Sequence, residues 1–169
     1  MRILIVRHAP AGNSEEWVAS GKSDAARPLT PAGRVKMLQA VAGLAGLADR
    51  PNLIATSPYR RCVQTAIILR SRFRGARLVK VDALKPAGDQ DKALEWLGSL
   101  RGEAAVALVG HEPSLGRLAC RLLSGGNAAF IRLKKGACLM IEAPAPVVAG
   151  NAVLHWHLQP RQLRALGGE

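Results

Sequence analysis

Two short apolar runs in this chain each end at a histidine, and this arrangement constrains the fold more than any other feature. Residues 3–6 (ILIV) are followed by Arg7 and His8, and residues 105–109 (AVALV) are followed, after one glycine, by His111. Continuous apolar runs of this length are typical of strands buried on both faces of a parallel sheet. In an open α/β sheet, ligands bind beyond the carboxyl ends of such strands. The sequence therefore predicts that both histidines lie at one binding crevice.

Segments with helical periodicity alternate with these runs. The pattern predicts strands at about 2–7, 52–56, 77–81, 104–109, 137–142 and 152–158, and helices at about 31–47, 58–73, 89–100 and 113–123. Such alternation is typical of an α/β fold with a parallel sheet. A chain of 169 residues is long enough for one adequate core. We therefore expect a single α/β domain over residues 1–169.

Proline marks three of the expected helix starts. The dipeptides Thr30-Pro31, Ser57-Pro58 and Glu112-Pro113 each place Pro where a helix would begin, and the first two put a hydroxyl cap before it. These pairs predict helices whose first residue is the proline.

Arginine side chains accompany the two histidines. Arg7 precedes His8, and Arg60 and Arg61 fall in the first turn of the helix that follows the expected strand at 52–56. Guanidinium groups bind phosphate oxygens in a bidentate fork, and an imidazole flanked by such groups can act as a nucleophile toward phosphorus. Neighbouring helical residues point about 100° apart, so only one of the two helix arginines can face the pocket well. The pattern predicts an anion site built from several segments.

Four motifs, in this order, resemble those of the histidine phosphatase superfamily. They are Arg7-His8, the turn at 29–33 (LTPAG), the segment at 57–65 (SPYRRCVQT) and Gly110-His111-x-Pro113. Residues 27–30 (RPLT) and 84–89 (LKPAGD) further resemble segments of the small SixA-type phosphohistidine phosphatases. The chain is too short for the large inserts that cover the site in phosphoglycerate mutases and acid phosphatases of this superfamily.

The resemblance implies a fold and a set of site residues. The expected fold is the phosphoglycerate mutase-like three-layer sandwich, with a mostly parallel central sheet flanked by helices. His8 would be the nucleophile that becomes phosphorylated, and His111 would contact the transferring phosphoryl group. The motif spacing selects Arg61 over Arg60 as the second arginine of the site, so that Arg7 and Arg61 would bind the phosphate. Arg27 either contacts the phosphate or the flank of the substrate, or anchors the loop before Thr30.

The implied activity is hydrolysis of phosphohistidine on a protein substrate, for instance a histidine-phosphotransfer domain, with no cofactor and no metal. The chain has no recognisable general acid; Glu112 and Asp89 are candidates, and a helix-start charge is the alternative for both. A nitrogen leaving group needs less help than an alkoxide, so a missing acid matters least for phosphohistidine. Two alternatives remain: a small-molecule phosphomonoesterase of the same superfamily, and a phosphate-binding module without turnover.

The strong positive charge raises the question of nucleic-acid binding. The net charge is +12 and the isoelectric point is near 10.8. The basic residues are scattered along the chain, and one Tyr and two Phe offer little stacking surface for bases. We therefore expect no specific nucleic-acid partner, because an acidic protein or a phosphorylated substrate accounts for the charge equally well.

The remaining polar groups give weaker signals. Three cysteines form no paired metal-ligand spacing, the chain opens directly into a strand, and no apolar run reaches the roughly 20 residues that span a bilayer. We expect a cytoplasmic protein without a membrane segment, whose cysteines are inert, although Arg61 beside Cys62 would favour a thiolate. His155 and His157 share one face of a strand, but a metal site needs a third ligand, so a structural role is expected.

Overall fold

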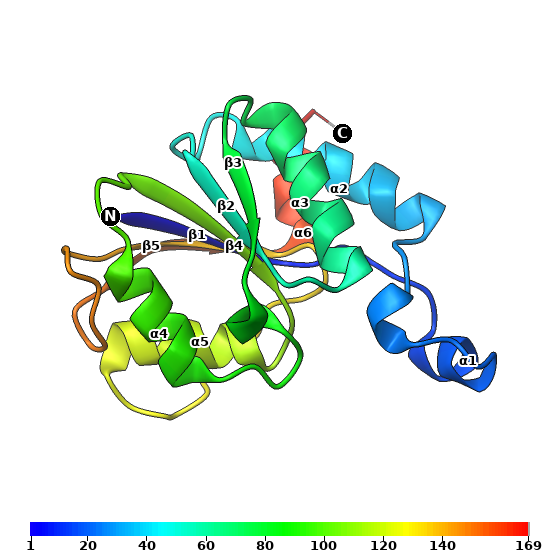
Figure 1. Ribbon diagram of the computed structural model, residues 1–169. Helices are drawn as coiled ribbons and strands as arrows, with labels where there is room; N and C mark the ends of the chain where they lie inside the picture. The colour runs from blue at the N-terminus through cyan, green and yellow to red at the C-terminus, as the bar shows by residue number, and fades with distance from the viewer. Residues whose placement is uncertain (169) are drawn as a thin grey trace.

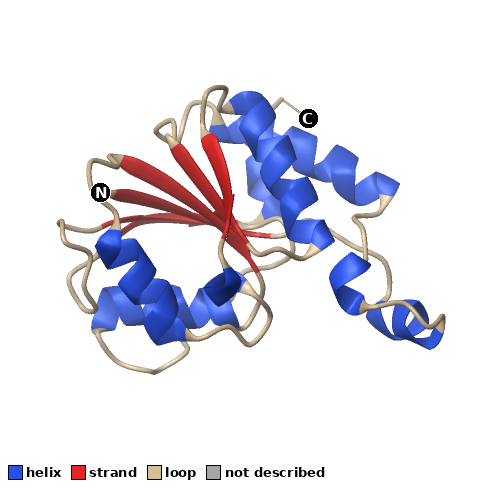
Figure 2. Cartoon of the chain, viewed as in Figure 1, coloured by secondary structure: helices blue, strands red, loops and turns tan. Residues whose placement is uncertain are grey.

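The computed structural model describes residues 1–168 and contains a six-stranded sheet with the strand order β3-β2-β4-β1-β5-β6. Four neighbouring strands run parallel to one another: β3 (Arg77–Lys80), β2 (Leu53–Thr56), β4 (Ala105–Gly110) and β1 (Arg2–Arg7). The fifth strand, β5 (Cys138–Glu142), pairs antiparallel with β1, and the edge strand β6 (Val153–Leu158) pairs antiparallel with β5. The predicted α/β architecture with a mostly parallel central sheet is confirmed (Figure 2).

Helices cover both faces of this sheet (Figure 1). One face carries α2 (Pro31–Leu44), α3 (Arg60–Arg72) and α6 (Pro160–Leu166), and the other carries α4 (Gln90–Ser99) and α5 (Ser114–Ser124). The short α1 (Ser14–Ala19) lies at the side of the molecule next to the 3-10 helix η1 (Asp24–Ala26), and a second 3-10 helix, η2 (Asp82–Leu84), follows β3. None of the helices in residues 1–168 has the length and apolar character needed to cross a membrane.

The apolar run of β1 is explained by the two layers that it separates. Ile3 and Ile5 pack in the core beneath α4 and α5, whereas Leu4 and Val6 pack in the core beneath α2, α3 and α6. All four side chains are fully or almost fully buried, and each buried aliphatic side chain contributes about 1.5–3 kcal/mol. A strand with two buried faces has no polar alternation, which is why its sequence reads as one continuous run.

The helix starts differ in part from the prediction. Thr30 caps α2 as expected, with its Oγ1 accepting a hydrogen bond from the amide of Gly33, and Pro31 is the first helical residue. The helix expected at residue 58 begins only at Arg60, because Ser57 Oγ accepts from the Tyr59 amide in a turn before the helix. Pro113 lies before the first residue of α5 rather than at it.

Candidate active site

His8 and His111 leave two neighbouring parallel strands at the same level. Arg7 of β1 pairs with Gly110 of β4, so the histidine that follows each of them emerges at the same edge of the sheet. The two imidazole rings lie with centroids 5.2 Å apart and planes at 62°. Their side chains are nearly enclosed, with relative exposures of 5% for His8 and 3% for His111. The expected meeting of the two histidines is therefore present in the structure.

The neutral form of His8 is strongly favoured. Burial lowers its pKa to about 3, a direction that the charges of Arg61, Arg7 and Lys135 reinforce and the hydrogen bond with Ala9 opposes. Nδ1 of His8 lies 2.8 Å from the carbonyl oxygen of Ala9. A carbonyl can only accept, so Nδ1 carries the proton. No hydrogen bond to Nε2 of His8 occurs within residues 1–168, so the lone pair on this nitrogen is unshared.

His111 has the opposite tautomer. Nη2 of Arg61 lies 3.4 Å from Nδ1 of His111, and a guanidinium can only donate, so this nitrogen is the acceptor. The proton is then on Nε2, which lies 3.0 Å from Oγ of the buried Ser57. Burial lowers the pKa of His111 to about 3; the charges of Arg61 and Arg7, and that of His8 whenever it is protonated, act in the same direction, and Asp24 acts against them. Both imidazoles are neutral at physiological pH.

Arg61 points into the site and Arg60 does not. The side chain of Arg61 is buried, whereas Arg60 is exposed on the outer side of α3. The guanidinium of Arg61 lies over the ring of Tyr59 at 4.9 Å, and the same ring meets His111 edge to face at 5.2 Å. Nε of Arg61 is buried without a hydrogen-bond partner. The structure therefore brings Arg61, as expected, against His111.

A carboxylate that the sequence analysis did not single out lies between two of the arginines. Asp24 of η1 accepts from Nη2 of Arg61 at 2.9 Å and from Nε of Arg27 at 2.7 Å. Burial opposes its ionisation, but the hydrogen bond from Arg27 and the charges of Arg61 and Arg27 outweigh that effect and lower the pKa of the Asp24 carboxyl. Arg27 also donates from Nη1 to the carbonyl of Gly12 at 2.5 Å. Arg27 thus anchors the loop around η1 and contributes charge near the site.

Two further cations act on His8 through their charges, Arg7 and Lys135. Nη1 of Arg7 donates to the carbonyl of Leu133 at 2.7 Å, and Nε of Arg7 is buried without a partner. The sequence analysis also missed Lys135. Partial burial lowers the pKa of its ammonium group, and the charges of Arg7, Arg27 and Arg61 act in the same direction. Four cationic side chains therefore surround the two neutral imidazoles.

The motif at 29–33 positions the loop that follows His8. The amide of Thr30 donates to the carbonyl of Pro10 at 3.1 Å, and a Cβ on Gly33 would lie 2.1 Å from that same carbonyl oxygen. Only glycine allows this close approach of α2 to the loop. The amide of Ala9 donates to Oγ1 of the buried Thr65, which ties the loop to α3. The backbone that follows His8 is therefore held in place by α2 and α3.

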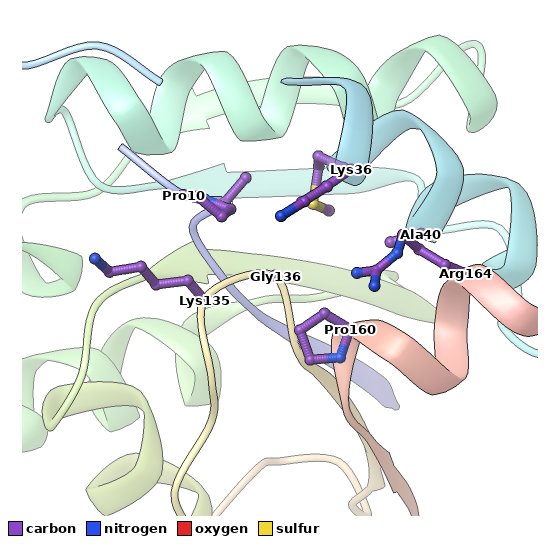
Figure 3. A pocket seen from close by; sticks show the side chains of 9 residues that line it. Pro10, Lys36, Ala40, Lys135, Gly136, Pro160 and Arg164 are labelled. Atoms are coloured by element: carbon purple, nitrogen blue, oxygen red, sulfur yellow. The ribbon is translucent and has the colours of Figure 1, made fainter. Parts of the chain in front are cut away.

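Figure 3 views a small hollow on the α2 side of this loop, lined by residues of the loop after β1, α2, α6 and the turn before β5. Lys36 of α2 and Arg164 of α6 point into the hollow, whereas the ammonium group of Lys135 points away from it. The hollow measures about 20 Å³, roughly the space for one water molecule, so it is a minor recess beside the site.

The two candidate proton donors have structural partners. Oδ1 of Asp89 accepts from the amides of Asp91 and Lys92 and caps α4. Oε1 of Glu112 accepts from the amide of Leu133 at 3.0 Å. Helix capping accounts for Asp89, and a contact with the segment before β5 accounts for Glu112.

Two of the three cysteines and the second histidine pair lie outside the site, whereas Sγ of Cys62 lies 3.3 Å from Nε2 of His111. All three thiols are free and buried. Burial raises the pKa of Cys62 to about 12 and outweighs the charge of Arg61, which acts in the expected direction and lowers the pKa. Nε2 of His155 pairs with Glu142 at 2.8 Å, and Nε2 of His157 lies 3.4 Å from the Gln159 amide nitrogen. Within residues 1–168 no group of three His, Cys, Asp or Glu side chains is arranged to hold a metal ion.

The chain is similar in sequence or in fold to several known proteins. The family model described as histidine phosphatase superfamily (branch 1) matches residues 3–86. An uncharacterized protein of Picosynechococcus sp. (strain ATCC 27264 / PCC 7002 / PR-6) is 29% identical over 147 residues, which cover 86% of this chain and 87% of that protein.

Two solved structures show the same fold. The protein histidine phosphatase SixA, complexed with tungstate, is 24% identical, with a TM-score of 0.83 over 96% of this chain and 99% of that one. A mycobacterial glucosyl-3-phosphoglycerate phosphatase complexed with VO3 is 15% identical, with a TM-score of 0.69 over 92% of this chain and 97% of that one.

Proposed function

The chain belongs to the histidine phosphatase superfamily, and from that premise we propose that it removes the phosphoryl group from phosphohistidine on a protein substrate, with His8 as the nucleophile. The observation that carries the proposal is the state of His8. Its ring is neutral, its Nδ1 proton is committed to the Ala9 carbonyl, and its Nε2 has no partner among the described residues. A nucleophilic imidazole needs these three properties together.

The first step forms an Nε2–P bond at His8 and breaks the N–P bond of the substrate. The substrate imidazole leaves with the proton already on its other nitrogen, so it departs as a neutral ring. His8 keeps its own proton on Nδ1 and becomes a phosphorylated imidazolium, whose charge the Ala9 carbonyl stabilises. No net proton transfer is needed, which fits a site whose two sequence-derived acid candidates have structural partners.

The second step returns His8 to its starting state. Water attacks phosphorus and the Nε2–P bond breaks. Both protons of the water stay on the product, which leaves as dihydrogen phosphate, and His8 is again neutral with its proton on Nδ1. Arg7 and Arg61 stabilise the charge on the phosphoryl oxygens in both steps, because guanidinium groups form strong charge-assisted hydrogen bonds with them. His111 donates from Nε2 and stays neutral, so it can contact a phosphoryl oxygen in place of Ser57.

The small-molecule alternative is favoured by one observation, the likeness in fold to the glucosyl-3-phosphoglycerate phosphatase. The two functions differ in the leaving group, because an alkoxide requires a general acid and an imidazole does not. The deciding experiment measures phosphate release from a phosphorylated histidine-phosphotransfer domain, a sugar phosphate and an aryl phosphate. A higher kcat/KM for the phosphohistidine domain supports the proposal, and a higher kcat/KM for the sugar phosphate replaces it with the phosphomonoesterase.

Tight binding of the phosphoprotein without phosphate release would instead identify a phosphate-binding module. The variant His8→Ala provides the blank for each substrate.

A further inference from the structure

A hollow of about 380 Å³ opens beside Arg7, next to the proposed phosphoryl site. Its walls come from the start of α5 and from the segment between α5 and β5. The lining includes three arginines and one carboxylate: Arg7, Arg117, Arg132 and Glu112. Arg7 thus borders both the phosphoryl site and this hollow, so a ligand in the hollow lies directly beside a phosphoryl group at His8.

A second hollow of about 330 Å³ continues the first along α5. The two share Arg117 and Ala129 in their lining, and the second extends to Arg121 and Gln90. Together they form a groove, here named the α5 groove, that begins at Arg7 and runs past Arg117 to Arg121. Such a length exceeds what the phosphoryl group itself requires, so the groove is available for the parts of a substrate that flank it.

The charge of the α5 groove is only partly compensated. Arg121 pairs with Asp91 at 2.5 Å. The exposed side chains of Arg117 and Arg132, in contrast, make no hydrogen bond or ion pair in the part of the chain that the structure describes. Glu112 is already engaged by the amide of Leu133. The groove therefore presents unpaired guanidinium groups, whose natural complement is a set of carboxylates.

An aromatic side chain beside the groove distinguishes a protein ligand from a small anion. Phe130 is 60% exposed, and the residues before and after it line the α5 groove. Its backbone amide and that of Ile131 both donate to Sγ of Cys120 at 3.2 Å, so the segment is attached to α5. Exposed arginines next to an exposed aromatic side chain are the composition enriched at protein–protein contacts.

We propose that the α5 groove binds an acidic segment of the phosphoprotein substrate, with Arg117 and Arg132 contacting carboxylates that flank the phosphorylated residue and Phe130 packing on its surface. The inference rests on the proposed function and adds the chemistry by which a protein substrate is chosen.

The test uses two synthetic phosphohistidine peptides, phosphorylated chemically with phosphoramidate, that differ only in flanking glutamates or glutamines. Wild-type protein is expected to prefer the glutamate peptide by roughly tenfold in kcat/KM, mostly through KM, and to lose this preference at high salt. The double variant Arg117→Ala/Arg132→Ala brings the ratio of the two kcat/KM values close to one. The matched control, Arg70→Ala/Arg72→Ala, removes the same charge from exposed positions at the far end of α3 and keeps the wild-type ratio.

The outcomes separate the two proposals. Release from both peptides with equal kcat/KM in the wild type overturns the docking proposal and leaves the proposed function in place. An equal loss of preference in the control variant also overturns it, because the effect then comes from net charge alone. If phosphate is released from neither of the two peptides, the proposed function is overturned, and the docking proposal with it. With a folded histidine-phosphotransfer domain as substrate, Phe130→Ser is expected to raise KM and leave kcat unchanged. An unchanged KM would show that Phe130 does not contact the substrate.

Discussion

Asp24 and Arg61 are joined by two hydrogen bonds although 37 residues separate them in the chain. Nη2 of Arg61 donates to Oδ2 of Asp24 at 2.9 Å, and Nη1 donates to the backbone carbonyl of Asp24 at 2.8 Å. A carboxylate therefore occupies part of the guanidinium fork that we expect to bind phosphate. A phosphoryl group entering the site must share Arg61 with this carboxylate or displace it.

The variant Asp24→Asn is expected to bind inorganic phosphate about tenfold more tightly, because a competing negative charge next to Arg61 is removed. It is also expected to lower the free energy of unfolding, since two buried guanidinium groups lose their counter-ion. The loss should be only about 1–2 kcal/mol, because the carboxylate itself is partly exposed to solvent. Competitive inhibition constants and urea midpoints measure the two effects. Asp49→Asn, which removes an exposed partner of Arg2, serves as the control. Weaker phosphate binding would mean that Asp24 mainly aligns Arg61 for the substrate.

His8→Ala is expected to abolish turnover and leave the fold intact, because the residue follows β1 and its ring does not belong to either apolar core. Phosphate release and circular dichroism test the two parts. In the wild type, the phosphoryl group is expected to appear on His8 as an acid-labile label that forms equally well with a chelator present. Near-normal release by the variant would refute the role of His8, and loss of labelling with the chelator, restored by a divalent ion, would refute the metal-free step.

Arg61→Ala is expected to lower kcat/KM by about 10²–10³, by analogy with loss of one transition-state hydrogen-bond donor, whereas Arg60→Ala has little effect. The structural reason is that Arg61 is buried against His111 and Arg60 faces solvent. Rates with a phosphohistidine domain, measured beside urea midpoints, separate a catalytic loss from an unfolded variant. Equal losses in the two variants would contradict the assignment of Arg61.

The sequence predicted the sheet and the meeting of the two histidines because both depend on local patterns. The run before His8 is apolar throughout since β1 is buried on two faces, and the register of Arg7 with Gly110 then fixes the neighbouring side chains. The short helix α1 escaped prediction because it buries no side chain and so has no apolar period. The helix α6 begins at Pro160, just as α2 begins at Pro31, so a proline at the helix start was present in the sequence although no helix was predicted there.

Asp24 and Lys135 were missed for a different reason. Asp24 lies 3 residues before Arg27, a spacing that allows an ion pair, but only the fold brings Arg61 to the same carboxylate. Lys135 reaches the site because Gly136, which has a positive φ of 82°, turns the chain so that its amide donates to the carbonyl of His8 at 3.1 Å. Neither contact leaves a periodic or motif signal. The assignments of Arg7, Arg27, Arg61, His8 and His111 to catalysis or binding stay predictions that the variants above test.

The last prediction concerns pH. Both site histidines have a pKa lowered from 6.5 to about 3 in the folded protein. Below pH 6.5 the unfolded chain binds a proton at each of these positions and the folded chain does not. The free energy of unfolding therefore falls as the pH falls from about 6.5 toward 3, by up to about 1.4 kcal/mol per pH unit for each histidine.

Urea midpoints at pH 7, 6 and 5 are expected to show this slope in the wild type and a smaller slope in His8→Ala, which lacks one of the two groups. Arg60→Ala, which leaves both site histidines in place and changes an exposed position, should keep the wild-type slope. The carboxylates that titrate below pH 5 are common to all three proteins and cancel in the comparison. If His8→Ala and the wild type lose stability in parallel over this range, the folded and unfolded chains bind protons equally at position 8, and the lowering of the His8 pKa by burial is refuted.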